Sequence, residues 1–162
     1  MLVVDLTTEE IERTDLPETL LRRFLGGRGI NAWLLAEHVG PGTDPLGPEN
    51  VLVLSCGLLT GTEVPSSSRL HLGARSPLTG LLGSSNVGGH FGAALRAAGV
   101  QAKSGKAAKL AVIGVGGENL VRYACMMTGD RHAAGRTGLG AVIGAKNLKA
   151  ITVRGGKRRG KG

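Results

Sequence analysis

Glycine is the residue that most restricts the fold of this chain. The 162 residues include 28 glycines, more than twice the usual share of about 7%. The glycines form separate clusters without a Gly-X-Y period, which argues against collagen and against a flexible linker. Only four residues are aromatic, so the core must consist mainly of Leu, Val, Ile and Ala. We therefore expect a domain with many tight turns and close backbone contacts.

Residues 65–92 form the stretch most suited to holding a ligand. They contain a Pro-Leu-Thr-Gly turn, a Ser-Ser-Asn-Val-Gly-Gly segment that we predict to be a loop, and one cation, Arg69. Gly88 and Gly89 let backbone amides approach a ligand, and small polar side chains precede them at Ser84, Ser85 and Asn86. A helix that begins at Gly89 would favour an anion at its N-terminus. A polar hairpin followed by a capped helix explains the same residues equally well.

Hydrophobic patterning predicts short strands interleaved with helices, and hence an α+β fold with mixed and antiparallel sheets. The Gly26–Gly29 joint is either a C-cap with a turn or a backbone ligand surface with Arg28 as its anchor. We expect strand 69–74 to be half-buried, with Arg69 and His71 on its polar face, and we assign no chemistry to His71. The predicted strands are 2–6, 11–14, 51–56, 69–74, 110–115, 120–126 (after a turn at Gly116 and Gly117) and 150–153. The predicted helices are 15–25, 30–38, 89–98 and one through Leu139, Val142 and Ile143.

The length predicts a single domain, residues 1–153, followed by a flexible basic tail, residues 154–162. The formal net charge is +8, and the tail supplies five of these charges, which leaves the domain only mildly basic. A solvated end explains such a tail better than a nucleic-acid-binding arm, because few aromatic residues are present for base stacking. We find no signal-peptide pattern and no apolar run long enough for a membrane span, so we expect a cytoplasmic protein.

Familiar catalytic patterns are missing from the sequence. There is no P-loop, and the GVGGEN segment does not fit the G-x-G-x-x-G pattern of dinucleotide-binding folds. Cys56 and Cys125 are too few for an iron–sulfur cluster, and we expect both to act as small core residues. The residues alone thus indicate an anion pocket without an evident general acid or base.

Five ordered blocks of sequence resemble one known family. The blocks are LGGRGINAWLL, PLGPENVLVLSCGLLTGTEVPSSSR, SPLTGLLGSSNVGGHFGAALRAAG, GGENLVRYACM and DRHAAGRTGLGAVIGAKNLKAI, which together reach to about Val153. They resemble the N-terminal domain of the aldehyde ferredoxin oxidoreductase family, tungsten enzymes that hold the metal on two pyranopterins. In that family the domain is the α+β base on which the cofactor lies. The resemblance therefore implies a pyranopterin-binding domain.

The resemblance also implies roles for individual residues. Asn86 resembles the asparagine whose side-chain oxygen binds the magnesium ion that bridges the two pterin phosphates, and Ala133 resembles the residue whose carbonyl binds the same ion. Both donors suit magnesium, which takes few protein oxygens and completes its shell with phosphate and water. Arg69 resembles an arginine beside the pterin. The full set of expected cofactor contacts is Arg69, Ser85, Asn86, Gly88, Gly89, His132, Ala133, Gly135 and Arg136.

Departures from the family pattern shape the expected function. His132 stands where the family commonly has arginine, and the chain is several tens of residues shorter between Gly99 and Leu110. We expect the helical domains that carry the family's iron–sulfur cluster and substrate pocket to be missing. We expect a stand-alone carrier, storage or assembly protein for a tungsten or molybdenum pyranopterin, without an iron–sulfur cluster. The alternatives are a small subunit that completes an aldehyde-oxidising enzyme and, third, a nucleic-acid-binding module.

A domain surface that holds the cofactor would need to be shielded from solvent. We therefore expect a homodimer or a higher even oligomer, with Arg69, Asn86 and Ala133 at or near the interface, because closed symmetric assemblies are the commonest. A recipient oxidoreductase is the other expected partner.

Overall fold

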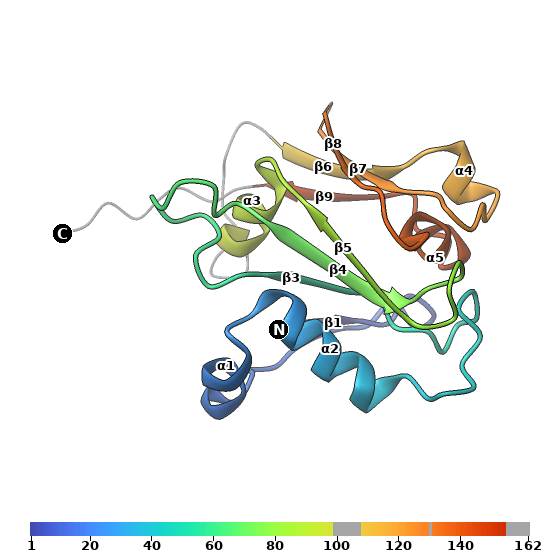
Figure 1. Ribbon diagram of the computed structural model, residues 1–162, viewed down its shortest axis with the longest axis horizontal. Helices are drawn as coiled ribbons and strands as arrows, with labels where there is room; N and C mark the ends of the chain where they lie inside the picture. The colour runs from blue at the N-terminus through green and yellow to red at the C-terminus, as the bar shows by residue number, and fades with distance from the viewer. Residues whose placement is uncertain (99–107, 130, 155–162) are drawn as a thin grey trace.

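Two antiparallel sheets make up most of the structure, a computed structural model that describes residues 1–98, 108–129 and 131–154 (Figure 1). The first sheet has the strand order β3-β4-β5 and the second the order β8-β7-β6-β9. The strands of the first sheet are β3 (Val53–Cys56), β4 (Leu70–Arg75) and β5 (Leu82–Val87); those of the second are β6 (Ala108–Ile113), β7 (Met126–Thr128), β8 (His132–Ala134) and β9 (Ala150–Arg154). Every strand pairing among the described residues is antiparallel.

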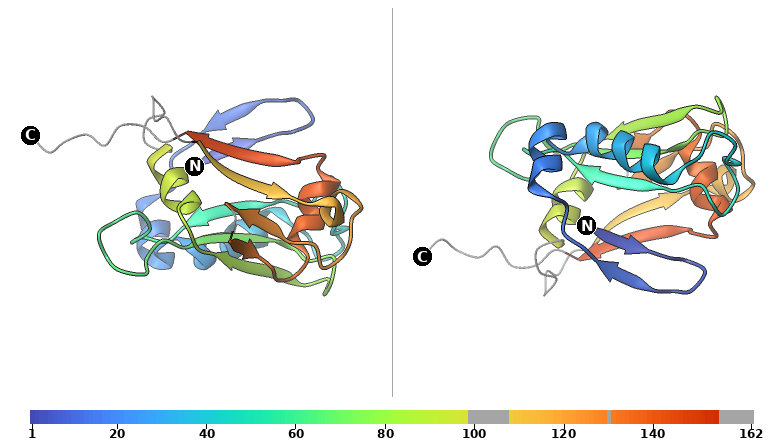
Figure 2. Two further views of the ribbon diagram at one scale, coloured as in Figure 1. Left: turned by 90° about the horizontal axis from the view of Figure 1, so that it is seen from above. Right: turned by 90° about the horizontal axis from the view of Figure 1, so that it is seen from below.

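Five helices and a separate hairpin complete the described part of the chain. The helices are α1 (Glu18–Phe24), α2 (Gly27–His38), α3 (Phe91–Ala98), α4 (Val115–Glu118) and α5 (Leu139–Ala145), and the hairpin is β1 (Leu2–Val4) with β2 (Ile11–Arg13). The hairpin lies on the side of the molecule opposite β5 (Figure 2). These elements confirm the α+β class.

The main core lies between the two sheets. Leu70, Leu72 and Ala74 alternate along β4 and are fully buried. They pack with residues of the second sheet, including Ile113 and Met126, and with the apolar sides of α3 and α5. Those two helices lie toward opposite ends of the space between the sheets (Figure 1). Short aliphatic side chains therefore fill the core, as the lack of aromatics requires.

Helix α2 covers the other face of the first sheet. Its residues Ile30, Leu34 and Leu35 form a second core cluster with Val53 of β3. Gly73 of β4 permits this approach, since a Cβ there would lie 3.1 Å from the side chain of Asn31. The expectation that strand 69–74 is half-buried is thus wrong for β4, in which every residue from Leu70 to Ala74 is buried.

Three local expectations are corrected by tertiary packing. Residues 84–87 belong to strand β5, whose partner is β4 with Leu70 opposite Val87, so they do not form a loop. Gly116 and Gly117 lie in helix α4 instead of a turn, and the following strand starts only at Met126. Helix α2 already begins at Gly27, while the predicted C-cap falls on Leu25, whose φ is +53°. In each case contact with another element decides the local conformation.

The remaining expected elements are present. The opening hairpin, the helices α1, α2, α3 and α5, and the closing strand all occur close to their expected positions. The predicted tail, residues 154–162, lies outside the described residues except for Arg154, which ends β9. In the described ranges, the helices are all too short or too polar to cross a lipid bilayer.

Candidate functional site

The expected site residues gather where an edge of one sheet faces an edge of the other. We call this place the seam and define it by residues 85–89, at the end of β5, and residues 132–136, in and after β8. Thr128 Oγ1 donates a hydrogen bond of 3.4 Å to the Gly88 carbonyl, and the Arg136 N–H donates one of 3.3 Å to Ser85 Oγ. No strand pairing among the described residues joins β5 to β8. The seam therefore leaves backbone groups of both edges available to a ligand.

Contacts along the seam place Ala133 near Asn86. His132 lies against Gly88 and Gly89 at one end, while Arg136 bonds to Ser85 at the other. Strand β8 therefore runs alongside β5 in the opposite direction. Ala133 and Asn86 both lie in the stretch between these two contact points. Both residues are exposed. The structure thus brings together residues that are 47 positions apart in the sequence.

A hollow of about 270 Å³ opens at one end of the seam. Its lining residues are Ser66, Ser68, Arg69, Gly88, Gly89 and His132. A Cβ on Gly88 would lie 3.5 Å from His132 Nδ1 and 3.9 Å from Arg69 Nη1. Gly89 has φ +82°, and a Cβ there would lie 2.7 Å from His132 Cδ2. Glycine at both positions is therefore what lets the imidazole and the guanidinium close in on the backbone.

The hollow suits an anion the size of a phosphate group. Its lining offers a guanidinium, an imidazole and two hydroxyl groups, all able to donate hydrogen bonds to oxygen. Helix α3 begins at Phe91, two residues beyond Gly89, so the positive end of its dipole lies close by. A volume of about 270 Å³ falls just below the range of about 300–1,000 Å³ for sites that enclose a small molecule. The hollow can thus hold one anionic end of a larger ligand.

Asn86 lies in a second polar group on the same sheet. It stands opposite His71 in the β4–β5 register, and His71 Nδ1 is hydrogen-bonded to Asn86 Oδ1. The other ring nitrogen, Nε2, is 2.9 Å from Ser84 Oγ. Burial is the main effect that lowers the pKa of His71; the bond to Asn86 opposes it, and the charge of Arg28 adds to it. His71 is thus a buried, neutral partner of Asn86.

Other expected residues take different positions. Ser85 is buried, and its hydroxyl accepts the hydrogen bond that holds residue 136 against β5. Gly135 and Arg136 are exposed, and a Cβ on Gly135 would meet open space. Sequence reasoning missed three residues: Ser66 and Ser68, which precede Arg69, and His71. Only the strand register could have linked His71 to Asn86, because the two are 15 positions apart.

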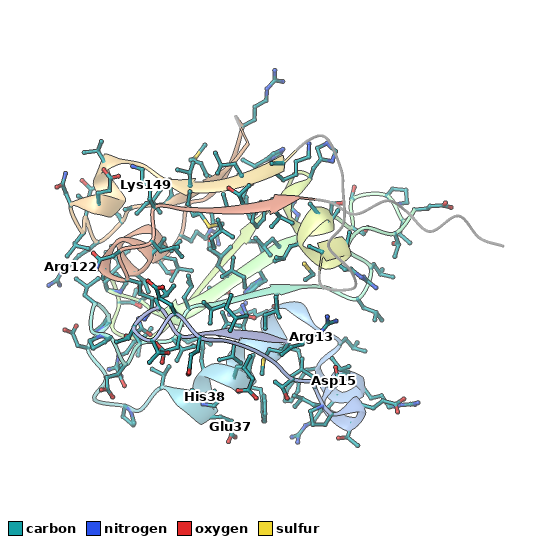
Figure 3. All side chains as sticks on the ribbon, turned by 180° about the vertical axis from the view of Figure 1, so that it is seen from behind. Arg13, Asp15, Glu37, His38, Arg122 and Lys149 are labelled. Atoms are coloured by element: carbon teal, nitrogen blue, oxygen red, sulfur yellow. The ribbon has the colours of Figure 1, made fainter. Side chains whose placement is uncertain are left out.

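The face opposite the seam carries charges of both signs. In Figure 3, seen from behind, Glu37 and His38 lie at the end of α2, and Arg13 and Asp15 lie near the hairpin. Lys149, also labelled, pairs with Glu118. Lys149 and Glu118 thus form an oppositely charged pair here, whereas the described lining of the hollow contains no acidic residue.

Fold and site together define an α+β domain with an open, glycine-floored hollow lined by Arg69 and His132. The chain belongs to the aldehyde ferredoxin oxidoreductase family, in which it corresponds to the N-terminal domain. The model of the family's N-terminal domain matches residues 1–103 and 100–155. This assignment confirms the expected family.

Relatives are similar over almost the whole chain, which spans about a third of their length. The chain is 38% identical to the tungsten-containing aldehyde ferredoxin oxidoreductase of Pyrococcus furiosus, covering 95% of the chain and 33% of the relative. It is 36% identical to the Thermococcus kodakarensis enzyme of the same name (96% and 33%). It is also 30% identical to an aliphatic sulfonate oxidoreductase, WOR-like subunit, of Pyrococcus furiosus (96% and 34%).

A solved structure shares the fold. The active site complex BamBC of benzoyl coenzyme A reductase, in complex with 1,5-dienoyl-CoA, matches with a TM-score of 0.88 and 33% identity, over 96% of this chain and 30% of that chain. The alignment to the Pyrococcus furiosus enzyme spans 197 positions, and the family model matches in two pieces that meet at residues 100–103. The relatives thus contain extra residues, in keeping with the shortening expected between Gly99 and Leu110.

Proposed function

We propose that this chain binds a tungsten or molybdenum bis-pyranopterin cofactor along the seam and acts as its carrier, storage or assembly protein. The observation that carries the proposal is the hollow in which Arg69 and His132 meet the Gly88–Gly89 backbone. Family membership supports the choice of ligand, since curated relatives are named as tungsten-containing. Arg69, Asn86 and Ala133 are exposed, so a cofactor bound there would be accessible to a recipient enzyme.

The donor set fits the phosphate end of such a cofactor. Arg69 and His132 would hold a phosphate by charge-assisted hydrogen bonds, and the hydroxyls of Ser66 and Ser68 would complete the contacts. The cofactor itself would supply the redox chemistry of the metal. The role of the chain is to orient the cofactor and to cover one of its faces.

The same seam offers two oxygens for a magnesium ion. Asn86 contributes its side-chain oxygen from β5, and Ala133 contributes its backbone carbonyl from β8. Magnesium binds few protein ligands and takes the others from phosphate and water. We propose that an ion at this point would tie the two sheet edges to the cofactor phosphates.

Purification from a host that makes the cofactor tests the function. We expect tungsten or molybdenum, phosphorus and pterin fluorescence in fixed ratio to the chain. Arg69→Gln and His132→Gln should each lower the bound amount, and His132→Arg should keep it. Arg22→Gln, which removes an exposed cation paired with Glu18 on α1, serves as the matched control. Wild-type protein that is free of metal, phosphorus and pterin would overturn the proposal.

The second candidate is a small subunit that completes an aldehyde-oxidising enzyme. The exposed apolar side chains of the hairpin, such as Val4 and Ile11, favour it, because such groups commonly mark an interface. Size-exclusion chromatography of the loaded protein with a cofactor-free oxidoreductase distinguishes the two candidate functions. Transfer of the cofactor followed by separation supports a carrier, and a lasting complex supports a subunit.

A further inference from the structure

We propose that His71 is a positioning residue that fixes the orientation of the Asn86 side-chain amide toward the ligand. This inference rests on the proposed function, in which Asn86 contacts the bound cofactor through a metal ion. The family resemblance assigned no role to His71, whose contacts with Asn86 and Ser84 suggest one.

The geometry isolates His71 from solvent and commits both of its ring nitrogens. Only 6% of the residue is exposed, although its cross-strand neighbour Asn86 is on the surface. Nδ1 bonds to Asn86 Oδ1 and Nε2 to Ser84 Oγ. The His71 carbonyl also accepts a 3.2 Å hydrogen bond from Asn31 Nδ2 of α2, which holds the strand in place beneath the helix. His71 is therefore fixed before any ligand binds.

The hydrogen bonds define one direction of donation. An amide oxygen can only accept, so Nδ1 of His71 must carry the proton. In a neutral imidazole the other nitrogen is then an acceptor, and the Ser84 hydroxyl must donate to it. The chain of donation runs from Ser84 through His71 to Asn86. A reversed Asn86 amide would need the opposite tautomer, in which Nδ1 accepts from the amide NH₂ group and Nε2 donates to Ser84 Oγ, so the protonation of Nδ1 marks the orientation proposed here.

As a consequence, the side-chain oxygen of Asn86 is already oriented before a metal ion binds. An amide oxygen has two lone pairs; His71 takes one, and the other remains for a single further partner at the seam. An outer partner that orients a metal ligand in this way is typically worth 10–100-fold in metal affinity. Because Asn86 is exposed, it would otherwise have to be ordered when the ligand binds, which costs free energy.

A double-mutant cycle with the Mn²⁺ complex of inorganic pyrophosphate as the probe tests the inference. We expect His71→Leu to weaken binding about 10–100-fold. His71→Asn, whose amide N–H can replace the Nδ1 donor, should restore most of the loss. In the Asn86→Leu background, His71→Leu should cause no further loss, because its effect passes through Asn86. An equal loss in both backgrounds would show a merely structural role and overturn the inference.

Nitrogen NMR of the ligand-free protein provides a readout that is independent of binding. We expect the His71 ring to carry its proton on Nδ1 and the Asn86 amide signals to shift in His71→Leu and in Ser84→Ala. A proton on Nε2 would overturn the inference even if every variant folds. A wild-type protein that does not bind the probe would instead count against the proposed function, while binding that is insensitive to His71 would count against this inference alone.

Discussion

Arg96 is a single side chain that holds the loop leading to the hollow. Its Nη1 donates to the carbonyls of Leu58 and Thr60, the latter at 2.9 Å, and thereby ties residues 57–60 to helix α3. Hydrogen bonds to charged groups contribute about 1.5–3 kcal/mol, and the exposure of Arg96 to solvent weakens its contribution. We expect Arg96→Ala to lower the free energy of unfolding by about 1–2 kcal/mol in urea titrations. Arg22→Ala should change it by less than about 0.5 kcal/mol, as is typical of surface pairs; equal effects would contradict this role of Arg96.

The burial of the Cys56 thiol can be tested through its reactivity. Burial raises the pKa of its thiol, the nearby Arg96 opposes the rise, and Sγ donates to the Gly92 carbonyl at 3.2 Å. Only the thiolate reacts with iodoacetamide. We expect slow alkylation of the folded protein at pH 8 and a large increase in urea, measured by mass spectrometry with Cys125→Ser protein.

The raised pKa of Cys56 also determines how the stability of the protein changes with pH. A thiol pKa that is raised on folding means that the folded state keeps its proton to higher pH than the unfolded state does. The contribution of Cys56 to stability is therefore complete below the unfolded pKa of about 8.5 and is lost as the pH rises through the higher folded value. A Cys56→Ala variant should lose less stability above pH 9 than the wild type. An identical pH profile would contradict this account.

Helix α5 depends on its glycines in a way that opposes helix propensity. A Cβ on Gly140 would lie 2.6 Å from the Cys125 carbonyl oxygen, and one on Gly144 would clash with the Gly117 carbonyl. Alanine favours an exposed helix by about 1 kcal/mol over glycine, but overpacking costs about 1–3 kcal/mol or more. We expect Gly140→Ala and Gly144→Ala to lower the melting temperature measured by circular dichroism.

Gly114 supplies the control for this prediction. A Cβ there would have no neighbour within 4 Å, and its φ is −89°. Gly114→Ala should therefore leave the free energy of unfolding within about 0.5 kcal/mol of the wild type. If the α5 variants are as stable as this control, the close packing of α4 on α5 is not what stabilises the region.

Elements with a strong local pattern could be predicted from the sequence, and those decided by distant contacts could not. Leu139, Val142 and Ile143 have helical spacing and lie in α5 as expected. Residues 84–87 have the polar composition of a loop, yet pairing with β4 draws them into a strand. Burial of His71 depends on α2 lying across β4, which no local pattern encodes. The seam was predictable as a residue set through the family resemblance, whereas its internal contacts required the tertiary structure.

At the scale of the whole molecule, the exposed hairpin bears on assembly. Leu2, Val4 and Ile11 are 58%, 51% and 69% exposed, and an isolated two-stranded hairpin is at best marginally stable in water. The seam lies on the other side of the molecule (Figure 2) and would also need cover if it holds a cofactor, so we propose a homodimer or higher even oligomer with the seam at or near the interface. Light scattering measures its mass.

Hydrogen exchange separates the two surfaces that such an assembly could bury. Amides of β1 and β2 should exchange much faster than those of β4 in a dilute monomer, because stability is lowest where few contacts form. Protection that rises with protein concentration at the seam, and not at the hairpin, supports the proposed interface. A stable monomer with cofactor bound would contradict it and favour the docking-subunit function.

A ligand bound across the open seam would also stabilise the folded state. The two sheets share a core, but at β5 and β8 they are joined mainly by side-chain bonds such as those of Thr128 and Ser85. A cofactor that contacts both edges would bind only while they are aligned, so its binding energy adds to the stability of the folded state. At a ligand concentration 100 times Kd this gain is about 2.7 kcal/mol. The melting temperature should then report cofactor loading directly, and release should begin with the parting of these two edges.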